Sequence, residues 1–285
     1  MPAVDLAALS PGTEVLVAPL YLAGPGSTAP VLDVLNFAPG WTKSIAFGTD
    51  TYFTSPCQRV RIANTEASHY GGWTITYAED PLGVPDWITT FDRNTPQEVV
   101  AGFADTLVRS LPSNFRDYFS GGPHYIGDGH EGVFRRHNWQ LVRGSGPYWS
   151  FSPDGHAGVR TRTHWIHEYD ELLSPPRSMW RVAAGADPRV ASTWRAYFSA
   201  FTLPHLRAAA AAALTSGNAV VRRVEEIPEP HRALVNVRLA EPSPTAPLVR
   251  AALDRRPYVP QLATAKAPTT NTDSTADHGR SRRQR

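Results

Sequence analysis

An internal repeat is the feature of this 285-residue sequence that most limits what it can fold into. The repeated positions keep one constant spacing: Trp73, Asp80, Pro81, Trp87, Phe91 and Thr95 correspond to Trp180, Asp187, Pro188, Trp194, Phe198 and Thr202. A fixed period of this kind is the sequence signature of a repeated structural unit. We therefore expect two similar units in tandem, and the repeat by itself assigns no function.

The repeat divides the sequence into five segments. The second copy carries an insertion between its Ser-Pro pair, Ser152-Pro153, and Trp180. The connection between the copies is too short to let them separate, so we expect the two units to pack together. The predicted segments are an N-terminal strand segment (1–20), the first repeat (21–117), the second repeat (118–217), a C-terminal strand segment (218–240) and a mostly disordered tail rich in Pro, Thr and Arg (241–285).

Hydrophobic patterning predicts the same elements in each repeat. In the first repeat, residues 73–78 and 86–91 are strand-like, and the turn-forming residues between them complete a hairpin. Residues 95–98 (Thr-Pro-Gln-Glu) match a capping box, which predicts an amphipathic helix from there to residue 111. The predicted fold class is α+β, with two pseudo-symmetric repeats that each consist of an antiparallel β-meander followed by one amphipathic helix. Further strands are expected over 41–47, 51–54 and 58–63, a short helix over 30–36, and flanking strands over 15–22 and 235–239.

Composition and charge are those of a soluble globular chain. The formal net charge is +2 and no apolar run is long enough to span a bilayer, so neither charge nor hydropathy predicts a membrane partner. The single cysteine, Cys57, excludes an internal disulfide, and the N-terminus has no signal-peptide pattern. We therefore expect a cytoplasmic protein. The only lysines are Lys43 and Lys266, and this preference for arginine is typical of a GC-rich genome.

Several short motifs of the repeat resemble those of one protein family. They are Tyr21-Leu22-Ala23-Gly24, Gly40-Trp41, the Ser-Pro pairs, the hairpin tryptophans and the Thr-Pro-Gln-Glu box. On these motifs, residues 15–217 resemble the SPDY domain of streptomycete (actinobacterial) proteins, a domain of unknown function that occurs in one or more tandem copies. The naming motif, Ser-Pro-Asp-x-Tyr, is incomplete here, since residues 55–59 read Ser-Pro-Cys-Gln-Arg and residues 152–156 read Ser-Pro-Asp-Gly-His. The resemblance implies two tandem copies and no activity, substrate or cofactor.

Histidines and one acidic residue of the second repeat are the candidates for a metal site. His164 and His167 are three positions apart, which on a helix would place two ligands on one face. The alternating residues that precede them predict a strand instead, on which the two side chains would point to opposite faces. The other candidates, His130 and Asp128, lie in a glycine-rich stretch typical of a loop. A metal site and an exposed polar loop are therefore the two interpretations.

The other recurring polar residues indicate turns rather than catalysis. Ser55 and Ser152 lack the surrounding glycines of a nucleophile elbow. Asp80 and Asp187 each precede a proline in the hairpin loop, which is typical of an Asx turn. The recurring tryptophans are candidates for stacking platforms, but their position on paired strands favours burial in a core.

These observations favour binding over catalysis, because the repeated residues are apolar or turn-forming and the two copies share no set of reactive groups. We therefore expect a non-enzymatic interaction module that binds a protein partner and needs no cofactor. Nucleic acid is the second partner class, contacted without sequence preference by Arg280, Arg282, Arg283 and Arg285 of the tail. The alternative function is a metal-dependent hydrolase with its site in the His-rich second repeat.

Overall fold

A computed structural model describes residues 6–46, 48–66, 71–125, 127–144, 146–164 and 166–240. The chain divides into one compact unit, Met1–Glu241, and a second unit, Pro242–Arg285. The predicted tail and its four arginines lie outside the described residues. Within the described residues, no helix is both long and apolar enough to cross a bilayer.

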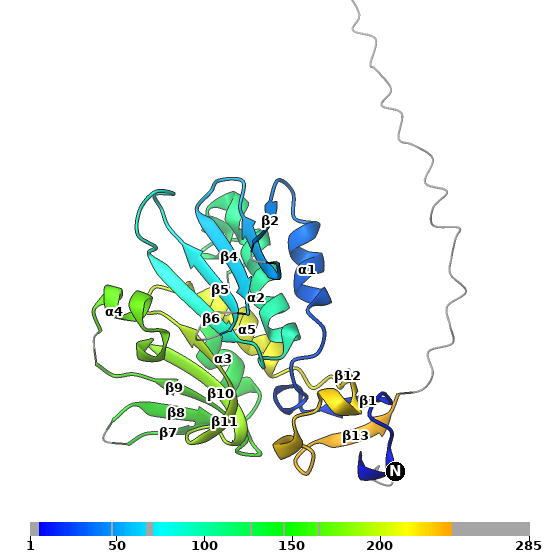
Figure 1. The fold of residues 1–285 in the computed structure, drawn as a ribbon. Coiled ribbons are helices and arrows are strands. Elements are labelled where there is room, and N and C mark those ends of the chain that lie inside the picture. Colours follow the sequence, from blue (N-terminus) through cyan, green and yellow to red (C-terminus); the bar gives the residue numbers. More distant parts are fainter. Residues whose placement is uncertain are drawn as a thin grey trace, which may run out of the picture. The chain divides into compact units, whose positions relative to one another are not determined.

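The described residues form one large antiparallel sheet, which contains both halves of the repeat (Figure 1). The halves meet where β6 pairs with β11, and in this pairing Tyr197 lies opposite Thr90. One continuous sheet, rather than two separate ones, therefore supports the structure. Its strands, in spatial order, are β2 (Thr42–Ala46), β3 (Asp50–Thr54), β4 (Val60–Thr65), β5 (Gly72–Tyr77), β6 (Trp87–Asp92), β11 (Ala191–Phe198), β10 (Trp180–Asp187), β9 (Ala157–Thr161), β8 (Tyr148–Phe151) and β7 (Gln140–Val142).

Four α-helices pack on one face of this sheet and share its hydrophobic core. They are α1 (Ala29–Asn36), α2 (Gln97–Ser110), α3 (Gly129–Arg136) and α5 (Pro204–Leu214). The fifth, α4 (Glu168–Leu173), lies in the connection between β9 and β10. The combination confirms the predicted α+β class. Short 3-10 helices complete the unit: η1 (Leu6–Ala8), η2 (Leu20–Leu22), η3 (Leu111–Ser113), η4 (Arg116–Tyr118), η5 (Pro175–Arg177), η6 (Val224–Glu226) and η7 (Glu229–His231).

A small second sheet is built from the two ends of the compact unit. Strand β1 (Glu14–Ala18) lies between β12 (Val220–Arg223) and β13 (Asn236–Leu239), and both pairings are antiparallel. Arg222 of β12 is buried and forms an ion pair at 2.7 Å with Glu98 of α2. The imidazole of buried His231 lies 2.8 Å from the carbonyl oxygen of Leu22 and 2.8 Å from the hydroxyl of Thr193. These polar contacts fix the small sheet against the main one.

The two halves of the main sheet contain their elements in the same order. In the first half, α1 is followed by β2 to β6 and then α2, and in the second half, α3 is followed by β7 to β11 and then α5. The halves differ in one connection, since α4 and η5 lie between β9 and β10, whereas the described residues between β4 and β5 include no helix. This order is what an internal duplication requires, and the duplication itself stays a prediction.

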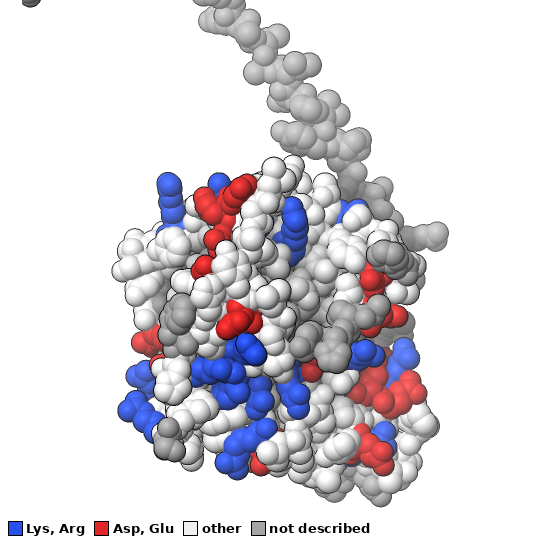
Figure 2. All heavy atoms as spheres, turned by 60° about the vertical axis from the view of Figure 1, so that its left-hand side comes forward, with Lys and Arg blue, Asp and Glu red and all other residues white. Residues whose placement is uncertain are grey.

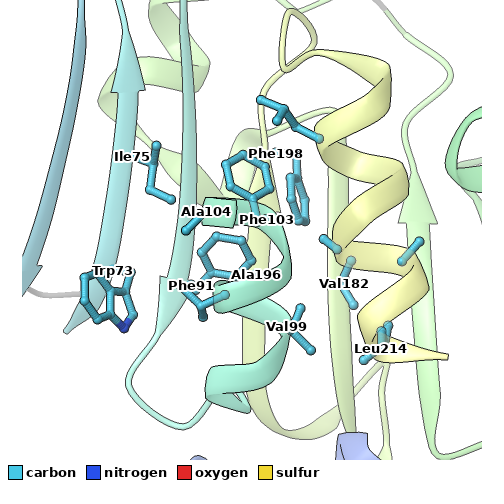
Figure 3. Close-up of a cluster of buried hydrophobic side chains, with 14 of the residues drawn as sticks. Trp73, Ile75, Phe91, Val99, Phe103, Ala104, Val182, Ala196, Phe198 and Leu214 are labelled. Carbon is cyan, nitrogen blue, oxygen red and sulfur yellow. The ribbon is translucent and has the colours of Figure 1, made fainter. Parts of the chain in front are cut away.

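The core between sheet and helices combines aliphatic side chains with a group of aromatic rings (Figure 3). Trp73, Trp87 and Trp194 are buried, as predicted for hairpin tryptophans, and the indole N–H of Trp73 donates to the side chain of Gln97 at 2.8 Å. Trp180 is partly buried and packs against the same core, and the guanidinium of Arg207 lies 3.5 Å from the centre of its ring. These burial classes agree with the expectation that all four rings are mostly buried.

The predicted capping box does not form. The hydroxyl of Thr95 donates to the Asp92 carboxylate and Glu98 pairs with Arg222, and α2 begins at Gln97. The strand predicted from the alternation at Val159 and Thr161 forms as β9, but it ends at Thr161 and does not reach His164.

Phe103 of α2 connects the two halves of the core, and its replacement tests whether they unfold together. Its ring contacts Phe91 of the first half and Phe198 of the second, at centroid distances of 5.5 and 6.1 Å. We expect Phe103→Ala to lower the free energy of unfolding by about 3–5 kcal/mol in one cooperative urea transition. The matched control is Phe37→Ala on an exposed ring, with an expected change within about 0.5 kcal/mol. Two separate transitions would show that the halves are independent.

Candidate functional site

The sheet face away from α1, α2, α3 and α5 is called the open face here. Side chains alternate between the two faces of a strand, and residues paired in register lie on the same face. Val159, Val182 and Ala196 belong to the core on the helix side, so their neighbours project from the open face. In one row across β8, β9, β10, β11 and β6 these neighbours are Trp149, Arg160, Arg181, Tyr197 and Thr90.

This row crosses a hollow of about 540 Å³ in the open face. The floor of the hollow comes from four neighbouring strands, and Pro176 of η5 adds a wall. The insertion that is specific to the second half therefore shapes the hollow. We call it the arginine hollow; its lining residues are Thr90, Asp92, Arg160, Pro176, Arg181, Arg195 and Tyr197.

The guanidinium groups of the arginine hollow are held by uncharged acceptors. Arg160 donates to the carbonyl of Pro176 at 3.3 Å, and Arg181 donates to the carbonyl of Pro188 at 3.3 Å. Arg195 donates from Nε to the hydroxyl of Ser192 at 2.7 Å. Among the ion pairs in the described part of the chain, none includes these three arginines. Their charge is therefore oriented by the protein but not neutralised by a carboxylate in an ion pair.

Several buried polar atoms of the arginine hollow have no hydrogen-bond partner among the described residues. They are Nε of Arg160, Nε of Arg181 and the hydroxyl oxygen of Thr90, a residue that is 5% exposed. An unsatisfied buried donor or acceptor costs about 1–3 kcal/mol. The lining of the hollow therefore contains hydrogen-bonding groups that the described residues leave unsatisfied.

Burial and like charge both act on these arginines. Burial, and then the charges of Arg181 and Arg162, lower the pKa of Arg160 to about 10. Burial likewise lowers the pKa of Arg181, and the charge of Arg195 acts in the same direction. A group with a pKa of about 10 stays protonated at neutral pH, so the hollow keeps its positive charge.

Asp92 is the acidic residue of the arginine hollow. Its carboxylate accepts from the backbone N–H of Arg195 at 2.6 Å, from that of Asn94 at 3.1 Å and from the hydroxyl of Thr95 at 3.1 Å. Burial raises the pKa of Asp92 to about 6, although these hydrogen bonds and the charge of Arg195 act in the opposite direction. The carboxylate thus joins β6 to β11, and the cations in the hollow outnumber it.

Two aromatic rings extend the open face next to the arginine hollow. Trp149 and Phe151 on β8 lie parallel, with centroids 5.5 Å apart and an interplanar angle of 4°. The guanidinium of Arg181 lies 4.9 Å from the centre of the Trp149 ring. Both rings lie close over Gly158 of β9, where an added Cβ would be only 3.1 Å from atoms of each. The absence of a side chain at Gly158 therefore lets both rings pack beside the arginines.

The first half has no corresponding set of charged residues. The same cross-strand row continues from Thr90 through Thr74 and Ala63 to Tyr52. On β9 and β10 it contains arginines, whereas on the strands of the first half it contains small or uncharged side chains. Figure 2 shows Lys and Arg gathered over one part of the molecular surface rather than spread evenly. The candidate site is therefore a property of the second half, completed by Thr90 and Asp92 of the first.

The structure separates the predicted metal ligands into two places. Asp128 directly precedes α3, and its carboxylate pairs with Arg136 at 2.6 Å. His130 is on α3 next to Trp180, and burial lowers the pKa of its imidazole to about 3. His164 and His167 are exposed, and His167 accepts from the backbone at the N-terminus of α4. Among the described residues, no group of three or more His, Cys, Asp or Glu side chains is placed to hold a metal ion.

The recurring Ser-Pro and Asp-Pro pairs form turns, as predicted. The Ser55 hydroxyl accepts from the N–H of Val60 at 3.0 Å, and that of Ser152 accepts from the N–H of Ala157 at 2.9 Å. In the hairpin loops, Asp80 accepts from the N–H of Leu82, and Asp187 accepts from the N–H of Arg189. These side chains satisfy the backbone of tight connections, and their recurrence is explained by structure.

Comparison with known proteins identifies a family for part of the chain. Residues 54–112 match the model of the SPDY family, described as a domain of unknown function (DUF317). This part of the chain is therefore similar to the SPDY domain. The SPDY match begins at the end of β3, includes β4, β5, β6 and α2, and ends in η3. No curated protein and no solved structure matches the chain. The SPDY match lies within the first half, so a second SPDY copy stays a prediction, and the three arginines of the hollow lie outside the matched residues.

Sequence reasoning did not single out these arginines, although part of the signal was present. Arg160, Arg181 and Arg195 each alternate with apolar residues in a strand-like segment, which places them opposite the core. What the sequence did not give is the strand order and register that bring the three residues together.

The raised pKa of Asp92 predicts a pH dependence of stability. Ionisation is disfavoured in the folded state, so the stability provided by neutral Asp92 is fully present below pH 4 and is lost as pH rises through about 6. Compared with Asp92→Asn, the wild-type protein should lose about 2–3 kcal/mol between pH 4 and pH 7, measured by urea unfolding at a series of pH values. Parallel curves for the two proteins would contradict the assignment.

Proposed function

We propose that the protein is a non-enzymatic module that binds an anionic partner in the arginine hollow. The observation that carries this proposal is the convergence of Arg160, Arg181 and Arg195 on one hollow without a carboxylate in an ion pair. Buried or half-buried charge is costly unless an opposite charge accompanies it. An anion from a partner would supply that charge to the guanidinium groups that line the hollow.

The chemistry of the arginine hollow supports binding rather than catalysis. Guanidinium groups hold carboxylates and phosphates through parallel hydrogen bonds and stay charged at neutral pH. The Asp92 carboxylate already accepts from two backbone N–H groups and one hydroxyl, so it is occupied as an acceptor. Acidic protein segments and nucleic acids both present the required anions. No observation in the described part of the chain favours the metal-dependent hydrolase.

Replacement of the arginines tests the proposal with inorganic polyphosphate as the probe. We expect Arg160→Ala, Arg181→Ala and Arg195→Ala each to weaken polyphosphate binding and to reduce the slope of log K against log salt by about 0.7–0.9. The matched control is Arg109→Ala, an exposed residue on α2 that pairs with Asp105 on the helix side. Binding can be measured by isothermal titration calorimetry over a range of salt concentrations. Equal losses in the control and the three variants would contradict the assignment of the hollow.

The arginines of the tail are tested separately. We propose that Arg280, Arg282, Arg283 and Arg285 add a nonspecific electrostatic contribution to nucleic-acid binding. Replacing all four with Ala should reduce the salt slope for nucleic acid while the effect of Arg160→Ala persists in that background. Loss of the Arg160→Ala effect in the tail variant would show that the hollow does not bind independently.

A further inference from the structure

We infer that the anionic partner is a single-stranded nucleic acid, whose phosphates bind in the arginine hollow and whose bases stack beside it. This inference rests on the proposed function and assigns the partner class to the same site. It depends on the continuity between the hollow and the rings of Trp149 and Phe151, which belong to the same open face.

The juxtaposition of rings and guanidinium groups matches the two requirements of single-stranded binding. Such proteins combine a positive groove that follows the backbone with aromatic platforms on which bases stack. Trp149 is directly paired with Arg160 across β8 and β9, and Arg160 with Arg181 across β9 and β10. A stacking surface and phosphate-binding groups therefore occupy consecutive positions of one row.

The planar groups on this face are stacked on one another rather than scattered. Arg181 lies over Trp149, the Trp149 ring is parallel to Phe151, and the guanidinium of Arg189 lies 5.5 Å from the centre of the Phe151 ring. Aromatic rings and guanidinium planes are the groups on which unstacked bases pack. Because Trp149 and Phe151 are half-buried, they hold a fixed orientation and still present surface to a ligand.

The polar atoms at the far end of the row also suit a nucleotide chain. The Thr90 hydroxyl is buried without a partner on β6, and the Nε atoms of Arg160 and Arg181 are unpartnered between Thr90 and the rings. From β8 to β6 the row spans four strand spacings of about 4.8 Å each. That length accommodates a short stretch of extended single strand, with acceptor oxygens along its backbone.

A duplex and an acidic peptide each meet only one of the two requirements. The bases of a duplex are stacked inside it, so their faces are not available to Trp149 and Phe151. The carboxylates of an acidic peptide would pair with the arginines, but they have no planar ring to stack. Only a ligand that has both phosphates and exposed bases would contact the arginines and also stack on the paired rings over Gly158.

The test compares the binding of three probes to the full chain: a single-stranded oligonucleotide, a duplex of the same sequence and inorganic polyphosphate. The oligonucleotide has about 15 nucleotides, in the range of site sizes of single-strand binders. Variants Trp149→Leu and Phe151→Leu remove a ring, whereas Trp149→Phe keeps one. We expect each Leu variant to weaken oligonucleotide binding by about 5- to 100-fold. Polyphosphate binding should stay within about 2-fold of wild type. The oligonucleotide affinity of Trp149→Phe should lie between those of wild type and Trp149→Leu. The matched control for ring loss is Phe37→Leu, an exposed ring on the helix side.

The outcomes separate this inference from the proposed function. Polyphosphate binding that depends on the arginines, together with oligonucleotide binding that is unchanged in Trp149→Leu, would overturn the inference and leave the proposed function standing. Equal affinity for single strand and duplex would overturn the inference as well. Absence of binding to all three anionic probes would overturn both. Retained polyphosphate binding in Trp149→Leu serves as the control that the variant is folded.

Discussion

The pairing of β6 with β11 is the interaction on which the rest of the structure depends. It turns two five-stranded meanders into one sheet and places Phe91 of the first half 5.6 Å from Phe198 of the second, measured between ring centroids. Phe103 of α2 contacts both rings, so the halves share one core. The same pairing sets Tyr197 beside Thr90 on the open face, and the floor of the arginine hollow is thereby continuous across the boundary.

Because the helices cover one face, the two faces of the sheet carry different constraints. Residues toward the helices must stay apolar, and the tryptophans that recur between the halves lie there, with Trp73 and Trp194 fully buried. On the open face burial is less uniform, since Tyr197 and Thr90 are buried whereas Arg195 is exposed, and the halves differ in sequence there. Where the second half has Arg160 and Arg181, the same row of the first half has Ala63 and Thr74. The repeated residues therefore maintain the fold, and the unrepeated ones form the candidate site.

Local patterns predicted the hairpins, a helix that starts within residues 95–98 and the Ser-Pro turns, because alternation and turn chemistry depend on neighbours in sequence. The failure of the predicted capping box has a non-local cause, since Glu98 pairs with Arg222, which is far along the chain. The segment that forms α4 has no clear hydrophobic period. Its Glu171 is buried, and the carboxylate accepts hydrogen bonds from the backbone N–H groups of Met179 and Ala200. Prediction of the arginine hollow requires the spatial order of four strands, and the hydrophobic period of a single strand does not determine that order.

The like charges in the arginine hollow carry an energetic implication for its ligand. Burial and neighbouring cations lower the pKa of Arg160 to about 10, which means that the folded protein holds this charge less favourably than water does. An anion bound there would reverse part of that cost, since opposite charge favours the protonated guanidinium. By linkage, a ligand that binds only the folded state also raises the stability of that state. An arrangement that is unfavourable in the free protein would therefore be favourable in a complex with an anion, and this difference favours an anionic ligand over a purely structural role for the arginine hollow.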